Sequence, residues 1–427
     1  MKIRFHHVLA FFILTLFFDI DYELSFVRLR IIDFFLVGLV ALMILSTGKL
    51  KISNNPATSG LYILIVYLLV NGITKVTFGS IIKETIQLVE YLFLMHLIAE
   101  ATNEPQKRKE FIDILFWGTG CIAFYSMMYN IAGGRFANYK DLDSPKHSFA
   151  FFALLAVIRL FSSNKKTLLQ LGFVFLGLVM LLLSGERKGW AGFVIGGGFF
   201  TYLQVKSSLS KKNINGIVTF FTIVGVVAII TGLLLVSLPE FRYLDRQLSS
   251  LSDIGSVFSG GNDSYASKSD EERIFMFNYG IQLFMKYPIT GIGIDEFKDY
   301  IIRDTHGFIS HDAHNFYLKI LTENGIIGII LFMVPLVLIF IELWKLSKNR
   351  IPHIALYARI AIALFFLGSV VNFFLAGKAL SWLYVILPCG MILGLNKELR
   401  FHKKVKEKRK QELTSEFPNV QETPIGL

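Results

Sequence analysis

Two arginines and one histidine are the side chains best suited to binding an anion and accepting a proton. Arg187 lies in the short segment "SGERKGW" (184–190), and Arg273 lies near the start of "SDEERIFMFNYGIQLFMKYP" (269–288). His314 comes just before a long apolar run. Arginine pairs with phosphate oxygens through a planar fork of donors, and a neutral imidazole can accept a proton. Together these residue types suit a site that binds an anion beside a base.

His314 and Asn315 stand at the expected start of a helix in "HDAHNFYLKI" (311–320). A helix N-terminus has unpaired N–H groups and a partial positive charge, so it favours anions and disfavours a protonated imidazole. His314 is therefore expected to be largely neutral and able to act as a base, while Asn315 can orient a ligand or the imidazole. The alternative is that both residues only cap the helix.

Both arginines lie at positions where a positive charge is locally unfavourable. Arg187 follows an apolar span in a connection expected on the outer side, where positive charge is disfavoured. Arg273 lies in the first turn of its expected helix, where the helix dipole disfavours a cation. We therefore expect a shared anionic ligand, with Lys188 beside it. The alternative is ion pairing, of Arg187 with Glu186 and of Arg273 with Glu271 or Glu272.

The composition indicates a membrane protein. Of 427 residues, 53% are hydrophobic and only 18% are charged, and apolar runs of roughly 17–25 residues typify spanning helices. We predict an all-α membrane protein with about twelve transmembrane helices. The expected spans are 7–20, 31–46, 59–74, 80–99, 111–132, 147–163, 167–184, 189–205, 214–237, 315–341, 354–375 and 380–396.

Lysine and arginine recur in alternate connections, which the positive-inside rule places in the cytoplasm together with both termini. The net charge of +11 is thus attributed to loops and to a tail near anionic membrane lipids, not to a nucleic-acid site. The predicted organisation has nine spans in 1–237, an extracytoplasmic loop at 238–313, three spans in 314–396 and a basic cytoplasmic tail at 397–427.

The long loop is expected to contain an amphipathic helix on the outer membrane surface or against the bundle. Ser269 and Glu272 form a capping box, which predicts a helix start, and Pro288 ends the helix. Apolar residues recur on one face at helical spacing, namely Ile274, Phe277, Ile281 and Phe284.

Three stretches together resemble the O-antigen ligase and O-antigen polymerase family of bacterial membrane proteins. They are "LSGERKGWAGFVIG" (183–196), "RIFMFNYGIQLFMKYPITGIGIDEF" (273–297) and "HDAHNFYLKILTENGIIGIILF" (311–332). The resemblance implies transfer of a glycan from undecaprenyl diphosphate to an acceptor, on the outer face of the bacterial inner membrane.

Carried onto this chain, the resemblance implies that Arg187 and Arg273 hold the diphosphate and that His314 takes the acceptor proton. The reaction would invert the anomeric carbon and need neither metal nor cofactor, because two arginines can neutralise the leaving group. The charged turn "GERKG" leaves open whether Lys188 also contacts phosphate.

The favoured function is an O-antigen ligase that joins finished glycan to the lipid A core. A repeat-unit polymerase, with another glycan as acceptor, is the alternative within the family. A transporter or flippase for lipid-linked sugar is the alternative outside it. That class favours charges at the membrane midplane, whereas the unusual charges of this chain gather at one face.

Other polar groups are weaker candidates. The residues His306, His311, Asp312 and His314 could form a metal cluster, although their spacing fits no zinc signature. Acidic residues in outer loops could bind a metal in a metal-dependent transferase, namely Asp141 and Asp143, or Asp19, Asp21 and Glu23. Glycines 196–198 are expected in helix packing. A polar cavity or an interfacial helix would explain Glu84, Glu90 and His96.

Overall fold

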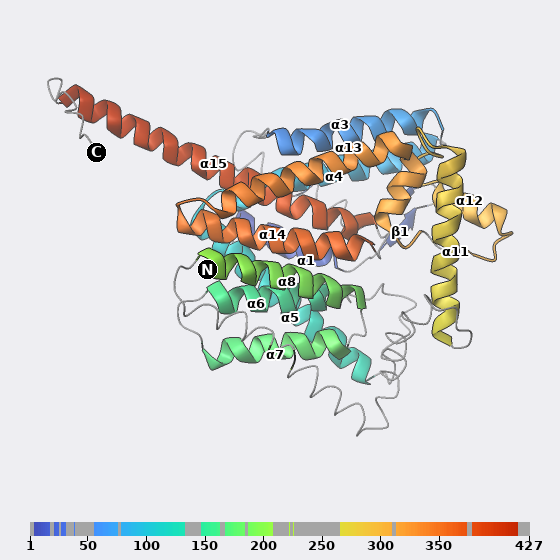
Figure 1. The fold of residues 1–427 in the computed structure, drawn as a ribbon, viewed down its shortest axis with the longest axis horizontal. Coiled ribbons are helices and arrows are strands. Elements are labelled where there is room, and N and C mark those ends of the chain that lie inside the picture. Colours follow the sequence, from blue (N-terminus) through green and yellow to red (C-terminus); the bar gives the residue numbers. More distant parts are fainter. Residues whose placement is uncertain are drawn as a thin grey trace.

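The protein is described from a computed structural model and forms a bundle of helices (Figure 1). The structure describes residues 4–17, 21–24, 27–30, 38, 55–75, 78–132, 147–162, 167–183, 187–207, 222, 225, 265–309, 313–373 and 378–416. Its helices in this part are α1 (Phe5–Thr15), α3 (Pro56–Ile73), α4 (Phe78–Ala101), α5 (Pro105–Ala132), α6 (His147–Ser162), α7 (Leu168–Leu183), α8 (Arg187–Ser207), α11 (Tyr265–Lys286), α12 (Phe297–Asp304), α13 (Phe316–Ser347), α14 (Pro352–Phe373) and α15 (Lys378–Glu416).

The prediction of a helical membrane protein is supported. Every predicted span that falls within the described residues coincides with a helix. The spans at 31–46 and 214–237 lie outside those residues apart from single positions. Three described helices are long and apolar enough to cross a membrane, over Pro105–Met128, Phe316–Ser347 and Pro352–Phe373. The full number of twelve spans stays a prediction.

One short segment departs from the all-helical expectation. Strands β1 (Asp21–Leu24) and β2 (Val27–Arg30) form an antiparallel two-stranded ribbon in which Asp21 lies opposite Arg30. The residues Tyr22, Val27 and Leu29 favour extended backbone. Because the ribbon lies in a connection between predicted spans, it leaves the helical architecture unchanged.

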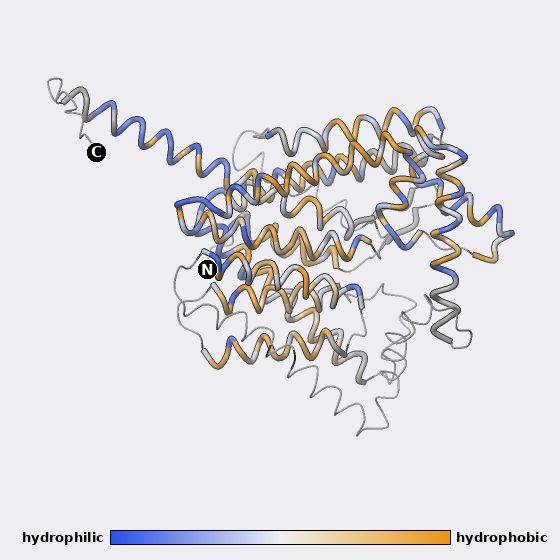
Figure 2. Tube along the Cα trace, viewed as in Figure 1, coloured by the Kyte–Doolittle hydropathy of each residue, from blue (hydrophilic) through white to orange (hydrophobic). Residues whose placement is uncertain are grey.

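The two ends of the bundle differ. Helices α11 and α12 lie at one end, whereas the N-terminal residues and the extension of α15 lie at the opposite end (Figure 1). The middle of the bundle is hydrophobic and its ends are more hydrophilic (Figure 2). We call the first the α11 end, comprising residues 265–309 and the starts of α8 and α13, and we call the other the terminal end.

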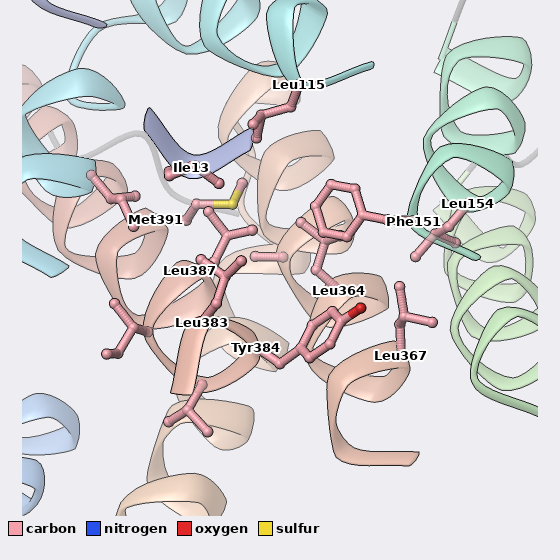
Figure 3. Close-up of a cluster of buried hydrophobic side chains, with 14 of the residues drawn as sticks. Ile13, Leu115, Phe151, Leu154, Leu364, Leu367, Leu383, Tyr384, Leu387 and Met391 are labelled. Carbon is pink, nitrogen blue, oxygen red and sulfur yellow. The ribbon is translucent and has the colours of Figure 1, made fainter. Parts of the chain in front are cut away.

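Helix α15 runs through the centre of the apolar core (Figure 3). Its buried residues Leu383, Tyr384, Leu387 and Met391 pack among buried side chains of four other helices, namely Ile13, Leu115, Phe151, Leu154, Leu364 and Leu367. In a lipid environment such contacts stabilise the bundle by van der Waals packing more than by the exclusion of water.

Helices α8 and α14 approach each other closely at two glycines. A Cβ atom added at Gly196 would lie 2.6 Å from the carbonyl oxygen of Ala363, and one added at Gly192 would lie 2.8 Å from Leu367. Glycines one helical turn apart allow backbones to meet in membranes. Gly196 thus makes the helix contact predicted for the glycine run, and the contact fixes the start of α8 against α14.

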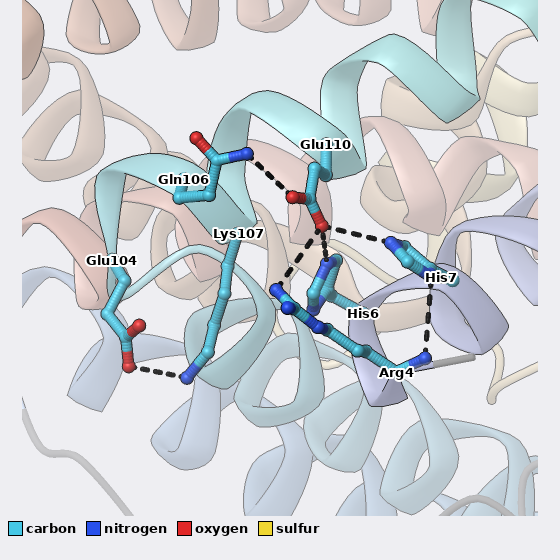
Figure 4. A network of polar contacts seen from close by, with 7 residues as sticks. All are labelled: Arg4, His6, His7, Glu104, Gln106, Lys107 and Glu110. Atoms are coloured by element: carbon cyan, nitrogen blue, oxygen red, sulfur yellow. Dashed lines mark hydrogen bonds and ion pairs between the residues drawn. The ribbon is translucent and has the colours of Figure 1, made fainter. Parts of the chain in front are cut away.

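Helix α1 is fastened to α5 at the terminal end by Glu110 (Figure 4). His6 Nε2 lies 2.6 Å and His7 Nε2 lies 3.0 Å from Glu110 Oε2. Gln106 donates to the other carboxylate oxygen at 2.6 Å. This network satisfies polar groups that would otherwise be costly next to an apolar core.

Candidate functional site at the α11 end

Asn315 is the N-cap of α13. Its Oδ1 accepts a hydrogen bond from the backbone N–H of Leu318 at 3.0 Å, and its backbone is extended. The side chain is buried. Asn315 therefore performs the capping role that the sequence offered as the alternative, which fixes where the helix begins.

His314 is exposed and has a φ angle of 48°. This left-handed conformation costs an L-residue roughly 1–2 kcal/mol. Backbone strain of this kind recurs where a side chain is held for function. The exposed imidazole thus lies directly before the start of α13.

Arg187 and Lys188 begin α8, instead of lying in a turn before it. Lys188 is half-buried. A cation in the first helical turn is disfavoured by the helix dipole, whereas an anion there is favoured. The helix start and its two basic residues thus together suit a negatively charged ligand.

The starts of α8 and α13 meet the same part of α14. Gly192 of α8 packs against Leu367 and Val371, while the Tyr317 hydroxyl of α13 donates to the carbonyl oxygen of Ser369 at 3.0 Å. Arg187 precedes Gly192 by less than two helical turns, and His314 precedes Tyr317 by less than one. The last turns of α14 therefore bring the starts of both helices to the same end of the bundle.

Arg273 reaches this end on α11, where its side chain is exposed. Helix α11 packs on α13 through Gly280, at which an added Cβ would lie 3.0 Å from Leu318. The Thr322 hydroxyl donates to the carbonyl oxygen of Gly280 at 3.3 Å. Arg273 lies about 10 Å along the helix from Gly280. Arg187, Arg273 and His314 are therefore at one end, and their sharing of a single ligand stays a prediction.

Helix α11 differs from its prediction at its start. It begins at Tyr265, so the capping-box residues Ser269 and Glu272 lie inside the helix. No proline interrupts residues 265–268, and the helix continues backwards past the local signal. Its end at Lys286, before Pro288, agrees with the prediction, because the residue before proline disfavours helical backbone.

The face of α11 that contacts the protein is not the one predicted to be apolar. Met276, Gly280 and Leu283 are buried, whereas Ile274 and Phe277 are 44% and 46% exposed. Both faces are thus apolar in part. The exposed face suits the lipid surface, as the amphipathic prediction proposed.

The turn that follows α11 fills a break in α13. Gly325 has a φ angle of 63° and interrupts the helix. Backbone hydrogen bonds join the two segments, from Ile292 to Thr322, Gly293 to Glu323, Ile326 to Pro288 and Ile327 to Ile289. A Cβ atom at Gly325 would lie 2.3 Å from the carbonyl oxygen of Ile289. The turn thereby takes up backbone groups that the helix break leaves unpaired.

Buried charges beneath this junction were missed in the sequence. Lys319 Nζ lies 3.4 Å from Asp295 Oδ1 and 3.6 Å from Glu323 Oε1. Glu323 also accepts the backbone N–H of Phe297 at 3.3 Å. The available signal was the presence of Lys319 and Glu323 inside an apolar span, where ionisable residues are usually functional.

Helix α3 contributes polar contacts to the same junction. Asn71 donates to the Thr290 carbonyl at 2.9 Å and to Asn324 Oδ1 at 3.2 Å. Lys75, at the end of α3, donates to the Thr290 carbonyl at 2.9 Å, and burial lowers the pKa of its ammonium group. A pocket of about 410 Å³ opens beside it, lined by Lys75, Tyr287, Pro288, Ile289, Thr290, Gly291, Ile292 and Tyr300.

Helix α12 is tied to α11 through Asp304. Tyr279 donates its hydroxyl to Asp304 at 2.8 Å, and Arg303 Nε donates at 3.0 Å. These two hydrogen bonds lower the pKa of Asp304, and burial with the same carboxylate raises the pKa of Tyr279. These hydrogen bonds hold α12 against α11 and involve none of the predicted site residues.

The other polar candidates are placed as follows. Exposed His306 has a φ angle of 51°, while His311, Asp312, Asp141, Asp143 and Asp19 lie outside the described residues. Asp21 and Glu23 lie in β1. Glu84, Glu90 and His96 are in the continuous helix α4, where buried His96 is hydrogen-bonded to Tyr62 of α3. Among the described residues, the groups that bring three metal-binding side chains together lie at the terminal end.

The fold is that of a helical membrane protein, and the candidate basic and polar residues lie on three segments at one end of its apolar bundle. The family model described as O-Antigen ligase matches residues 172–333. This range contains all three stretches on which the resemblance rested, and the match confirms that the chain resembles this family.

Two relatives are similar over a large part of the chain. An uncharacterized protein of Haemophilus influenzae is 25% identical over 278 residues, which cover 61% of this chain and 66% of that protein. The "Exopolysaccharide production protein ExoQ" of Rhizobium meliloti is 22% identical over 309 residues, covering 62% of this chain and 66% of that protein. The chain thus spans just under two thirds of each relative's length.

Proposed function

We propose that this protein transfers a glycan from undecaprenyl diphosphate to an acceptor hydroxyl at the α11 end of the bundle. The observation that carries the proposal is that three segments with candidate residues lie at the same end of the bundle. Arg187 begins α8, His314 precedes α13, and Arg273 lies on α11, which packs on α13. All three lie within the stretch that matches the O-antigen ligase family.

The proposed reaction forms one bond and breaks one. The acceptor oxygen attacks the anomeric carbon, the bond from that carbon to the diphosphate breaks, and His314 takes the hydroxyl proton. Attack opposite the leaving group inverts the anomeric configuration. Arg187, Arg273 and Lys188 neutralise the departing diphosphate, because charge-assisted donors stabilise charge that develops in the transition state. Asn315 supports the site by fixing the start of α13.

The acceptor decides between two functions that share this donor chemistry. Ligation to the lipid A core is our first proposal, in line with the matched family model. Polymerisation of repeat units is the second, and the similarity to an exopolysaccharide production protein favours it. Purified protein given labelled donor with either lipid A core or repeat-unit glycan as acceptor will separate them by which product forms.

Replacing Arg273 tests the proposed diphosphate site. Arg273→Ala, like Arg187→Ala, should weaken donor binding and reduce transfer by about 10²–10³-fold, the effect of losing one charge-stabilising donor. Arg273→Lys should recover only part of this loss, because a point charge lacks the bidentate fork. Donor binding and transfer are measured for each purified variant. Lys286→Ala, an exposed cation on the same helix, is the matched control. Normal donor binding by Arg273→Ala would contradict the proposal.

Transfer should not require a divalent metal ion at the reaction site, because arginines neutralise the leaving group in this proposal. Initial rates in EDTA should equal those in magnesium or manganese. The folded fraction is measured in the same samples, so that a loss of catalysis is distinguished from unfolding of the protein. Activity that disappears in EDTA and returns with magnesium or manganese would instead favour the pair Asp141 and Asp143 as metal ligands.

A further inference from the structure

Three potential metal ligands meet at the terminal end, far from the proposed transfer site. His353 lies in the first turn of α14, while Glu398 and His402 lie one turn apart on α15. His353 Nε2 lies 2.6 Å and His402 Nε2 lies 3.6 Å from Glu398 Oε1. The three ligand atoms all lie within 4.8 Å of one another. Two imidazole nitrogens and one carboxylate oxygen form a donor set suited to zinc.

The carboxylate is held in place from behind. Glu398 is 5% exposed, and its other oxygen, Oε2, pairs with Arg108, which is fully buried. Arg108 in turn donates from Nε to the Thr102 carbonyl at 2.8 Å and lies over the ring of Tyr357. Carboxylates that bind metals are commonly oriented by such second hydrogen bonds. Arg108 thus leaves Oε1 directed at the two histidines.

The histidines have room to adjust. Their side chains are 38% exposed at His353 and 47% exposed at His402. Ligand atoms around a tetrahedral zinc ion lie roughly 3.3 Å apart, given bonds of about 2.0–2.1 Å. The atoms must therefore move by only about 1–1.5 Å, and the exposed side leaves a coordination position for water.

The second cluster at this end has a different hydrogen-bond pattern. In the group of His6, His7 and Glu110 (Figure 4), His7 Nδ1 accepts the backbone N–H of Arg4 at 3.3 Å. In a neutral ring, Nε2 then carries the proton and donates it to Glu110. Gln106 also donates to Glu110. The side chains of His6 and His7 are only 2% and 9% exposed, so they lack the room to adjust that His353 and His402 have, and the cluster is a polar contact between helices.

We propose that His353, Glu398 and His402 bind a zinc ion that fastens the start of α14 to α15 where α15 leaves the bundle. Beyond His402, α15 continues as an exposed basic helix (Figure 2). The ion would hold the base of this extension to the membrane-embedded core. The site is independent of the proposed glycan transfer, which takes place at the opposite end.

Zinc binding is tested on the full-length protein, purified in detergent and freed of metal. Zinc is titrated in competition with a chromophoric chelator near neutral pH, and thermal unfolding is recorded with and without zinc. Wild type should bind one zinc ion and unfold at a higher temperature when it is bound. His353→Ala and His402→Ala should bind at least about tenfold more weakly and lose the stabilisation.

Two further variants sharpen the experiment. His306→Ala removes an exposed histidine at the opposite end and should bind zinc as wild type does. The double variant His353→Ala/His402→Ala avoids Glu398, whose loss would leave the buried charge of Arg108 unpaired. Zinc binding that is equal in wild type and the double variant, or undetectable in wild type, would overturn the proposal.

Discussion

At the residue scale, His314 has an exposed side chain and a left-handed backbone conformation that is unfavourable for residues with a Cβ atom. A φ angle of 48° suits glycine better than any L-residue. Neighbouring Asn315 already provides the helix cap. The helix cap therefore does not require an imidazole at position 314, whereas the proposed proton transfer does.

The substitution His314→Gly distinguishes the effect of backbone strain on stability from the effect of the imidazole on transfer. The substitution should leave stability unchanged or raise it by up to about 1 kcal/mol, because glycine adopts the left-handed region freely. Transfer should be lost and donor binding retained, since the imidazole is proposed to act on the acceptor. Thermal unfolding, donor binding and transfer are compared with His314→Ala and wild type. Near-normal transfer by His314→Gly would show that this segment serves only to begin α13.

At the element scale, the junction between α13 and the turn after α11 positions the site. The break at Gly325 receives the backbone of the turn, and buried Lys319 joins Asp295 to Glu323 below it. Helix α11, which carries Arg273, is connected through this turn to α13, which begins beside His314. Substitutions that disrupt this junction are therefore expected to reduce both the stability of the protein and its rate of transfer.

A pair of glycine substitutions measures the contribution of this junction. Gly325 and Gly307 both have positive φ angles, of 63° and 80°, so alanine is strained at either. An added Cβ meets the Ile289 carbonyl at 2.3 Å in Gly325→Ala, but nothing within 4 Å in Gly307→Ala. Gly325→Ala should therefore be less stable than Gly307→Ala, by about 1–3 kcal/mol, and slower in transfer. Equal unfolding temperatures would show that the close contact is unimportant.

At the scale of the whole molecule, the bundle has two chemically different ends. The α11 end carries the residues proposed for transfer, and the terminal end carries the basic extension of α15 (Figure 1, Figure 2). Lysine and arginine in alternate connections predict that the terminal end faces the cytoplasm. The transfer site would then face the outside of the inner membrane.

Cysteine labelling tests this orientation. In a background with Cys121 and Cys389 replaced by alanine, Phe308→Cys and Phe401→Cys place a thiol at positions that are 84% and 66% exposed in wild type. A membrane-impermeant maleimide should label the first in intact spheroplasts and the second only after the membrane is opened, since α12, which precedes position 308, and the extension of α15 lie at opposite ends. The reverse pattern would exclude an outward-facing site.

The sequence by itself determined the helical membrane class, the approximate positions of the described helices and the resemblance to the O-antigen ligase family. The class and the helix positions depend on local signals: apolar runs of spanning length, Pro288 after α11, and Asn315 before α13. Lys319 and Glu323 were visible as charges in an apolar span, but their partner Asp295 lies on a separate segment.

Only the tertiary structure decided how these elements meet. The break at Gly325 depends on the backbone of the turn after Pro288, and the buried face of α11 depends on α13. The grouping of His353 with Glu398 and His402 likewise depends on the packing of α14 beside α15. Such features arise from contacts between residues far apart in the chain, and local residue preferences carry no information about which distant backbone will complete them.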